Sequence, residues 1–102
     1  MVRDVYAADE ADPVEPHERV VAIFEVLGDR DPFVLLRVAQ QLAIANVSPT
    51  RCQLTALDRN AVKIEVILPG ITAPQGDLIR RKLQQLSVVD RVSVTTSPGD
   101  EE

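Results

Sequence analysis

One short loop combines the residue types best suited to hold a charged small molecule. Gly28-Asp29-Arg30-Asp31 precedes Pro32 and a segment with helical periodicity. The amide donors and the positive dipole end of a helix N-terminus favour a carboxylate or a phosphate, and the guanidinium of Arg30 adds a fork of donors. Asp31 can instead cap the helix itself, and Asp29 would repel an anion. These residues leave both interpretations open, an anion-binding loop and a self-capped helix start.

The single cysteine and the single histidine limit the other chemistry open to the chain. They exclude an internal disulfide, a cysteine-only zinc site and a two-histidine metal site. Cys52 lies in an alternating segment with Arg51 on the opposite face, which is typical of a small structural side chain. His17 has no predicted partner. No nucleophile–base pair, carboxylate pair or glycine-rich phosphate loop occurs at a usable spacing. We therefore expect no catalytic residues, no metal and no cofactor, and predict that the chain is not an enzyme.

Charge is distributed unevenly along the 102 residues. Six acids and two bases fall in residues 1–19, and three acids without a base fall in residues 97–102. The middle of the chain carries nine bases and seven acids. Within it, Arg80-Arg81-Lys82 could contact a phosphate or an acidic partner, although a solvated helix face is the alternative. The weak positive charge and the lack of an aromatic platform on the predicted strands argue against a nucleic-acid partner.

Both acidic ends contain too few apolar residues to offset the entropy of ordering. We expect disordered tails at residues 1–17 and 97–102, with one domain at residues 18–96 between them. If the first tail docks on a protein surface, Val5 and Tyr6 are the apolar residues through which it would do so. No apolar run is long enough to span a bilayer, and the first residues lack the apolar core of a secretory signal. A cytoplasmic location without a membrane partner is expected.

Four segments have the periodicity of strands. Residues 20–27 are apolar on both faces, which predicts a central strand. Residues 50–57 and 61–68 alternate between apolar and polar side chains and are separated by a short polar turn, so they predict a hairpin. A last strand is predicted over residues 88–96.

Two segments have the periodicity and end signals of helices. Asp31-Pro32 predicts the start of a helix over residues 32–45, and Asn46 suits the left-handed conformation that closes a helix. Thr72 and Gln75 have capping-box spacing at the start of the second helix.

The resulting order is strand, helix, strand, strand, helix, strand. Because strands joined through a helix favour a right-handed crossover, the expected fold is α+β and ferredoxin-like, βαββαβ. Its four-stranded antiparallel sheet carries both helices on one face. The predicted core comprises apolar residues of all six elements: Val20, Ala22, Phe24, Val26, Leu35, Val38, Leu42, Cys52, Leu54, Val62, Ile64, Val66, Ile79, Leu83, Leu86, Val92 and Val94.

The sheet face without helices is expected to mix apolar and charged side chains. Val21, Ile23 and Ile67 fall on that face together with charged residues such as Lys63 and Glu65. A mixed face suits a modest protein contact. Residues 50–57 form a predicted edge strand with few features that would prevent it from pairing with a strand of another chain. We therefore expect a homodimer, formed through the sheet edge or through the open sheet face.

The run from Gly28 to Leu54 resembles the ACT domain, a small-molecule-sensing module with this element order. The matching features are an apolar strand, an acidic loop ending in Asp31-Pro32, a helix, and Ala45-Asn46-Val47 before the second strand. Residues 78–95 are similar to the end of ACT domains in small regulatory subunits of acetohydroxyacid synthase, where a basic helix precedes a Val-Asp-x-Val strand. The resemblance covers residues 18–96.

The resemblance implies a non-catalytic regulatory domain that binds an amino acid or a related metabolite. The implied ligand cleft, which in many members lies between two subunits, is lined here by Asp29, Arg30, Asp31, Phe33, Asn46, Val47 and Ser48. Many amino-acid-binding members have glycine where this chain has Phe33, whose ring adds bulk and removes backbone freedom. Two alternatives stay open, a regulatory subunit of a larger enzyme and a protein-interaction domain without a ligand.

Overall fold

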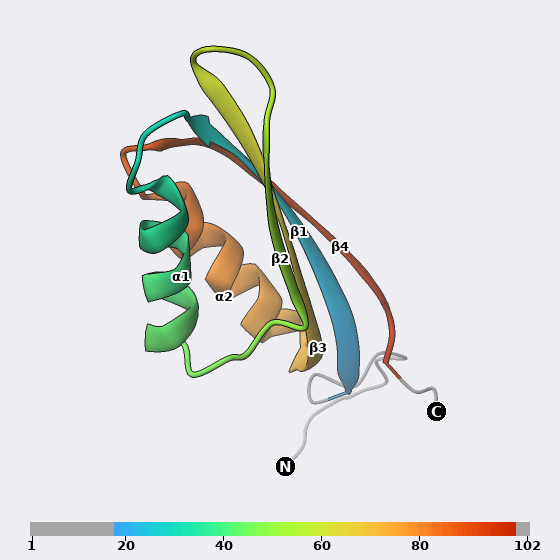
Figure 1. Ribbon diagram of the computed structural model, residues 1–102. Helices are drawn as coiled ribbons and strands as arrows, with labels where there is room; N and C mark the ends of the chain where they lie inside the picture. Colours follow the sequence, from blue (N-terminus) through green and yellow to red (C-terminus); the bar gives the residue numbers. More distant parts are fainter. Residues whose placement is uncertain (1–17, 100–102) are drawn as a thin grey trace.

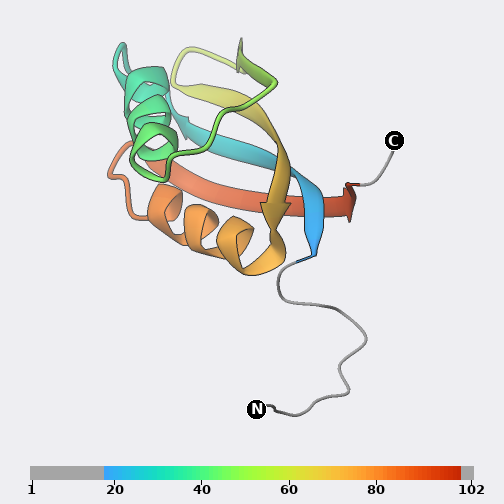
Figure 2. The same ribbon diagram turned by 90° about the horizontal axis from the view of Figure 1, so that it is seen from below.

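The computed structural model describes residues 18–99 of the 102-residue chain. The predicted tail at residues 1–17 lies outside the described residues. The described part forms one sheet with two helices on one of its faces (Figures 1 and 2). Six elements follow one another in the order β1 (Arg19–Asp29), α1 (Val34–Ile44), β2 (Arg51–Ala56), β3 (Ala61–Thr72), α2 (Ala73–Gln84) and β4 (Val89–Pro98).

The sheet order is β2-β3-β1-β4, and every neighbouring pair is antiparallel. The predicted α+β, ferredoxin-like βαββαβ fold is therefore confirmed. Strand β1 lies between β3 and β4, which explains why its sequence is apolar on both faces. Phe24 pairs with Val66 on one side and with Val94 on the other, and its side chain is fully buried.

The core lies between the sheet and the helices. Most of the predicted core positions are buried there: Ala22, Phe24, Val26, Val38, Leu42, Val62, Ile64, Val66, Ile79, Leu83 and Val92. Three others, Val20, Leu86 and Val94, are partly buried against this cluster.

Three predicted core residues are exposed instead, and each error has a structural cause. On α1 the buried stripe begins at Val34 rather than at Leu35, because Val34, Val38 and Leu42 recur at every fourth residue. Cys52 and Leu54 alternate as expected, but all of β2 is exposed, because neither helix reaches over this edge strand.

Helix α1 begins two residues later than predicted. The carboxylate of Asp31 accepts a hydrogen bond from the N–H of Phe33 at 2.7 Å, and its carbonyl accepts one from Val34 at 3.1 Å. Asp31 therefore closes a turn that contains Pro32, and the helix begins after this turn. At the other end Asn46 has the predicted left-handed conformation, with φ at 59°. The next residue, Val47, donates to the carbonyl of Leu42 at 3.1 Å, which satisfies a terminal acceptor.

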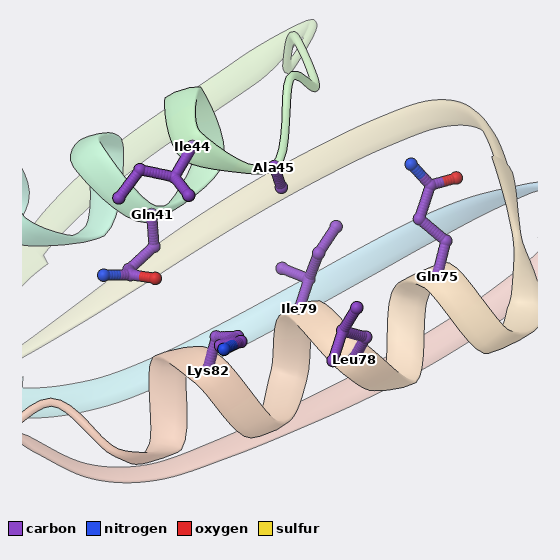
Figure 3. A pocket seen from close by; sticks show the side chains of 7 residues that line it. All are labelled: Gln41, Ile44, Ala45, Gln75, Leu78, Ile79 and Lys82. Atoms are coloured by element: carbon purple, nitrogen blue, oxygen red, sulfur yellow. The ribbon is translucent and has the colours of Figure 1, made fainter.

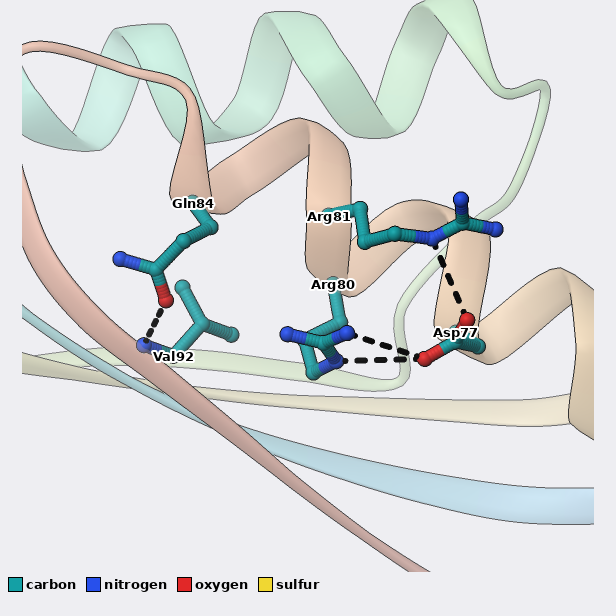
Figure 4. A network of polar contacts seen from close by, with 5 residues as sticks. All are labelled: Asp77, Arg80, Arg81, Gln84 and Val92. Atoms are coloured by element: carbon teal, nitrogen blue, oxygen red, sulfur yellow. Dashed lines mark hydrogen bonds and ion pairs between the residues drawn. The ribbon is translucent and has the colours of Figure 1, made fainter.

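Helix α2 has the predicted capping box and a second anchor at its end. The N–H of Gln75 donates to Thr72 Oγ1 at 3.2 Å, and the N–H of Thr72 donates back to Gln75 Oε1 at 3.4 Å. The side chain of Gln84 accepts a hydrogen bond from the N–H of Val92 at 2.9 Å (Figure 4). It also donates a hydrogen bond to the carbonyl of Asp90 at 3.0 Å. These bonds tie the helix end to β4.

Strands β3 and β4 are both longer than predicted. Strand β3 continues beyond residue 68 to Thr72, with Gly70 at φ 73° where its register with β1 shifts. Strand β4 continues to Pro98, which pairs with Val20. Ser97 and Pro98 are thus part of the sheet, whereas their sequence predicts that they belong to the carboxyl-terminal tail.

Gly28 lies where the end of β1 meets the turn before β4. A Cβ atom at this position would lie 2.5 Å from the carbonyl oxygen of Val88, closer than any ordinary contact. The next residue, Asp29, donates its N–H to that same carbonyl at 2.8 Å. Glycine is therefore required for this close approach of two backbone segments.

We expect Gly28→Ala to lower the free energy of unfolding by about 1–3 kcal/mol, because the added methyl group must displace backbone rather than side-chain atoms. Urea unfolding monitored by circular dichroism measures the change. Gly76→Ala is the matched control, since its Cβ would meet only side-chain atoms, the nearest being Ile71 Cδ1 at 3.4 Å, and would raise helix propensity. An equal loss of stability in both variants would contradict this role of Gly28.

Candidate ligand site

The loop between β1 and α1 is bonded to the connection between β2 and β3. Arg30 donates its N–H to the carbonyl of Asn60 at 2.9 Å, and its guanidinium donates to the carbonyl of Asp58 at 3.1 Å. The loop is thus fastened to the β2–β3 connection. The sequence leaves open whether Asp31 caps the helix start or leaves it free for an anion. The structure shows that this carboxylate binds the N–H of Phe33.

A cleft of about 410 Å³ lies between this loop and the edge strand β2. Arg30 and Asp31 supply its polar wall, and the apolar wall combines the start of α1 with the helix-side residues of β2 and β3. Its lining is Arg30, Asp31, Pro32, Val34, Leu35, Leu54, Ala56 and Val62. Three of these residues, Leu35, Leu54 and Ala56, are exposed although they are apolar. The cleft therefore combines a charged rim with an uncovered apolar wall.

The first turn of α1 opens beside this cleft. Among residues 18–99, the backbone N–H groups of Leu35 and Leu36 have no backbone acceptor, as expected for the first turn of a helix. Leu35 itself lines the cleft. Free donors and the positive end of the helix dipole thus lie at its wall and favour a carboxylate there.

The predicted site residues fall into two groups within one chain. Asp29, Arg30, Asp31 and Phe33 lie together at the start of α1, and Arg30 and Asp31 line the cleft. Asn46, Val47 and Ser48 follow the other end of α1, about 16 Å away along an 11-residue helix. A single chain therefore does not bring the two groups together.

Sequence reasoning missed the apolar wall of the cleft. Leu35 and Leu54 fit the periodicity of core residues, yet they are 39% and 40% exposed. Phe33 is 56% exposed and does not line the cleft, so its ring does not fill it. The sequence predicts that β2 lies at the edge of the sheet, but it does not show that the helices leave the helix side of this strand uncovered.

The remaining candidate groups give no sign of catalysis or metal binding among residues 18–99. Burial raises the pKa of the Cys52 thiol, which disfavours the thiolate that a nucleophile needs. Within this range no three His, Cys, Asp or Glu side chains are grouped closely enough to hold a metal ion. No helix in this part of the chain has the length and apolar character needed to cross a membrane.

The basic triplet on α2 is partly neutralised within its own helix. Arg80 and Arg81 both contact the carboxylate of Asp77, at 3.1 and 3.2 Å (Figure 4). These are pairs at helical spacing on an exposed face, which stabilise the helix weakly. Two of the three cations thus have a partner, as expected for a solvated face.

Comparison with solved structures shows that this is the fold of ACT domains. The crystal structure of the ACT domain from the GTP pyrophosphokinase of Chlorobium tepidum superimposes with a TM-score of 0.66. The match covers 76% of this chain and 99% of that domain, at 12% sequence identity. No family sequence model matches the chain, and no curated protein matches it in sequence.

Two other structures share the fold. A homoserine dehydrogenase from Thiobacillus denitrificans matches with a TM-score of 0.64 and 17% identity, over 79% of this chain and 18% of the dehydrogenase. The C-terminal domain of the MgtC protein from Mycobacterium tuberculosis matches with a TM-score of 0.63 and 12% identity, over 87% of this chain and 100% of that domain. At these identities the likeness concerns the fold alone.

We expect Cys52 to be alkylated more slowly in the folded chain than in the urea-unfolded chain at mildly alkaline pH, because its raised pKa leaves less thiolate. The ratio of the two rates should approach one as the pH rises above both pKa values. Iodoacetamide labelling followed by mass spectrometry measures both rates. Faster labelling of the folded chain would show an activated thiol and contradict the raised pKa of Cys52.

Proposed function

We propose that the chain is a non-catalytic regulatory domain that binds an amino acid or a related metabolite in the cleft beside β2. The observation that carries the proposal is that cleft, with its charged rim and its uncovered apolar wall. A second copy of the chain completes it. The ACT fold supports this function, since solved structures of this fold include a domain of GTP pyrophosphokinase and a part of a homoserine dehydrogenase.

Sheet topology explains how a second copy would complete the cleft. Ala56 at the end of β2 and Gly28 at the end of β1 both pair with Val62, so these two strands end at the same side of the sheet. If two β2 edges pair antiparallel about a two-fold axis, the start of one β2 lies beside the end of the other. The segment Asn46–Ser48 of the second copy then approaches the cleft of the first. The two predicted groups of site residues would thus meet between chains.

The edge of β2 is a better dimer surface than the open face of the sheet. On that face Lys63 contacts Glu25 at 3.8 Å, and Arg51 contacts Glu65 at 3.7 Å. Face-to-face pairing would remove these charges from water, which costs more than exposed pairs return. Pairing through β2 would instead cover the exposed side chains of Leu54 and Ala56 and add a strand to the sheet.

The cleft has complementary groups for both charges of an amino acid. The first-turn amides of α1 and the guanidinium of Arg30 suit a carboxylate. The carboxylate of Asp31 suits an ammonium group. The apolar wall of Leu35 and Leu54 suits a small side chain.

The dimer is tested by a charge on the β2 edge. We expect Leu54→Asp to convert the dimer to a monomer, because a carboxylate would be buried without a partner at the interface. Leu36→Asp is the matched control, since Leu36 is an exposed leucine at 53% that lies in the helix α1. Sedimentation equilibrium at micromolar concentration measures the mass. One chain's mass for the unaltered protein would contradict the proposal.

The ligand is tested by a thermal-shift screen of the twenty amino acids. At about a hundred times its dissociation constant, a ligand raises the free energy of unfolding by about 2.7 kcal/mol. We expect Arg30→Ala to abolish the shift and Arg37→Ala, which removes the same charge from an exposed position on α1, to preserve it. A shift that survives Arg30→Ala would place the ligand elsewhere.

One observation favours a domain that only pairs with other proteins. Arg30 and Asp31 already have hydrogen-bond partners within the chain, so a ligand must share them. A screen in which no amino acid shifts the melting temperature, together with an intact dimer, would support this second function. Co-purification with a large enzyme would support the related proposal of a regulatory subunit, such as that of acetohydroxyacid synthase.

A further inference from the structure

A second concavity lies on the other side of α1, between the two helices. Its volume is about 490 Å³, and its floor is apolar. Figure 3 shows its lining, with three residues from the end of α1 and four from α2: Gln41, Ile44, Ala45, Gln75, Leu78, Ile79 and Lys82. We refer to this concavity as the interhelix groove. It shares no residue with the cleft beside β2.

The interhelix groove has an exposed apolar side chain on each of its walls. Ile44 is 76% exposed and Leu78 is 48% exposed, one on each wall of the groove. Large apolar side chains on both walls of an open groove are typical of a surface that binds another polypeptide segment. A space of about 490 Å³ accommodates one or two side chains of an extended peptide.

The charged residues at the groove indicate which kind of polypeptide segment would bind there. Lys82 lies at one end of the groove and has no ion-pair partner among residues 18–99, whereas Arg80 and Arg81 share Asp77. Arg37 precedes Gln41 by four residues and Ile44 by seven, which places it on the same stripe of α1. In the described part of the chain no acidic side chain lines the groove. An acidic segment with a short apolar patch is therefore the complementary occupant.

The chain itself contains such a segment. Residues 1–17 carry five acids against one arginine, and Val5-Tyr6 forms an apolar pair within them. Strand β1, which follows this segment, begins beside the start of α2, because Arg19 pairs with Thr72, the cap residue of α2 (Figures 1 and 2). Extended, seventeen residues span up to about 55 Å, whereas the groove runs about 10 Å along α2 from Gln75 to Lys82. The segment is therefore long enough to reach the groove from the start of α2.

We propose that the acidic amino-terminal segment, residues 1–17, docks in the interhelix groove of its own chain. Val5 and Tyr6 cover Ile44 and Leu78, and the flanking carboxylates lie near Lys82. The attachment to β1 raises the local concentration of the segment to the millimolar range, so that two anchoring side chains suffice to hold it. The groove is then occupied in cis, and a partner chain that binds the same groove must first displace the segment.

Tyr6 is itself the probe for this proposal. The chain contains one tyrosine and no tryptophan, so its tyrosine emission reports on Tyr6 alone. If the segment is docked in more than about half of the molecules, acrylamide should quench Tyr6 about twofold less than in the urea-unfolded chain. The measurement uses the full chain in the monomeric Leu54→Asp background, so it does not depend on the proposed dimer.

Two variants localise the protection to the groove. Lys82→Glu and Leu78→Ser should both restore full quenching, because they remove the complementary charge and the apolar wall. Arg91→Glu is the control for charge, since it makes the same change at an exposed position on β4, where Arg91 pairs with Leu27 of β1. Leu36→Ser is the control for the exposed leucine. Urea unfolding midpoints confirm that all four variants fold.

Three results would overturn the proposal. Quenching of Tyr6 equal to that in the unfolded chain would show that the segment does not dock. Protection that survives both groove variants would place Tyr6 on another surface. Protection that disappears on dilution would mean that the segment docks on a second copy rather than on its own chain.

Discussion

The structure depends on the burial of one side of β1. This strand pairs with both β3 and β4, and Ala22, Phe24 and Val26 on its helix side are fully buried. Helix α2 lies over this strand and over β4. Because α2 packs mainly over β1 and β4, only α1 remains to cover β3 and β2. Helix α1 buries three residues and leaves β2 uncovered. Both concavities described above flank this helix.

Local patterns are sufficient to predict the elements but not their environment. Strands β2 and β3 alternate between apolar and polar side chains, the capping box of α2 is present in the sequence, and Asn46 closes α1 as its residue type indicates. The apolar run from Phe33 to Leu36 is compatible with two phases of α1, and only packing against the sheet chooses Val34 over Leu35. Leu54 alternates like a core residue, yet its strand lies at the edge. Alternation shows which side chains share a face, whereas burial depends on what covers that face.

The sequence predicts only part of the candidate site, because it does not show how separate elements pack together. The loop residues Arg30 and Asp31 line the cleft because the start of a helix after an apolar strand fixes their position. The ACT resemblance groups the segment Asn46–Ser48 with them, and within one chain it lies at the far end of α1. Sequence does not distinguish contacts within a chain from contacts between copies. The hydrogen bond from Arg30 to the carbonyl of Asp58 is equally invisible in the sequence, because it joins residues 28 positions apart.

Helix α1 forms a wall of both concavities, which sets the condition for any communication between them. Val34 and Leu35 lie on the β2 side near its start, and Gln41 and Ile44 lie on the α2 side near its end. A ligand in the cleft can influence the interhelix groove only if it binds more tightly to one position of α1 than to another. Three core side chains hold α1 against the sheet. Coupling of this kind is reciprocal, so an occupant of the interhelix groove that shifts α1 must change the affinity of the cleft by the same factor.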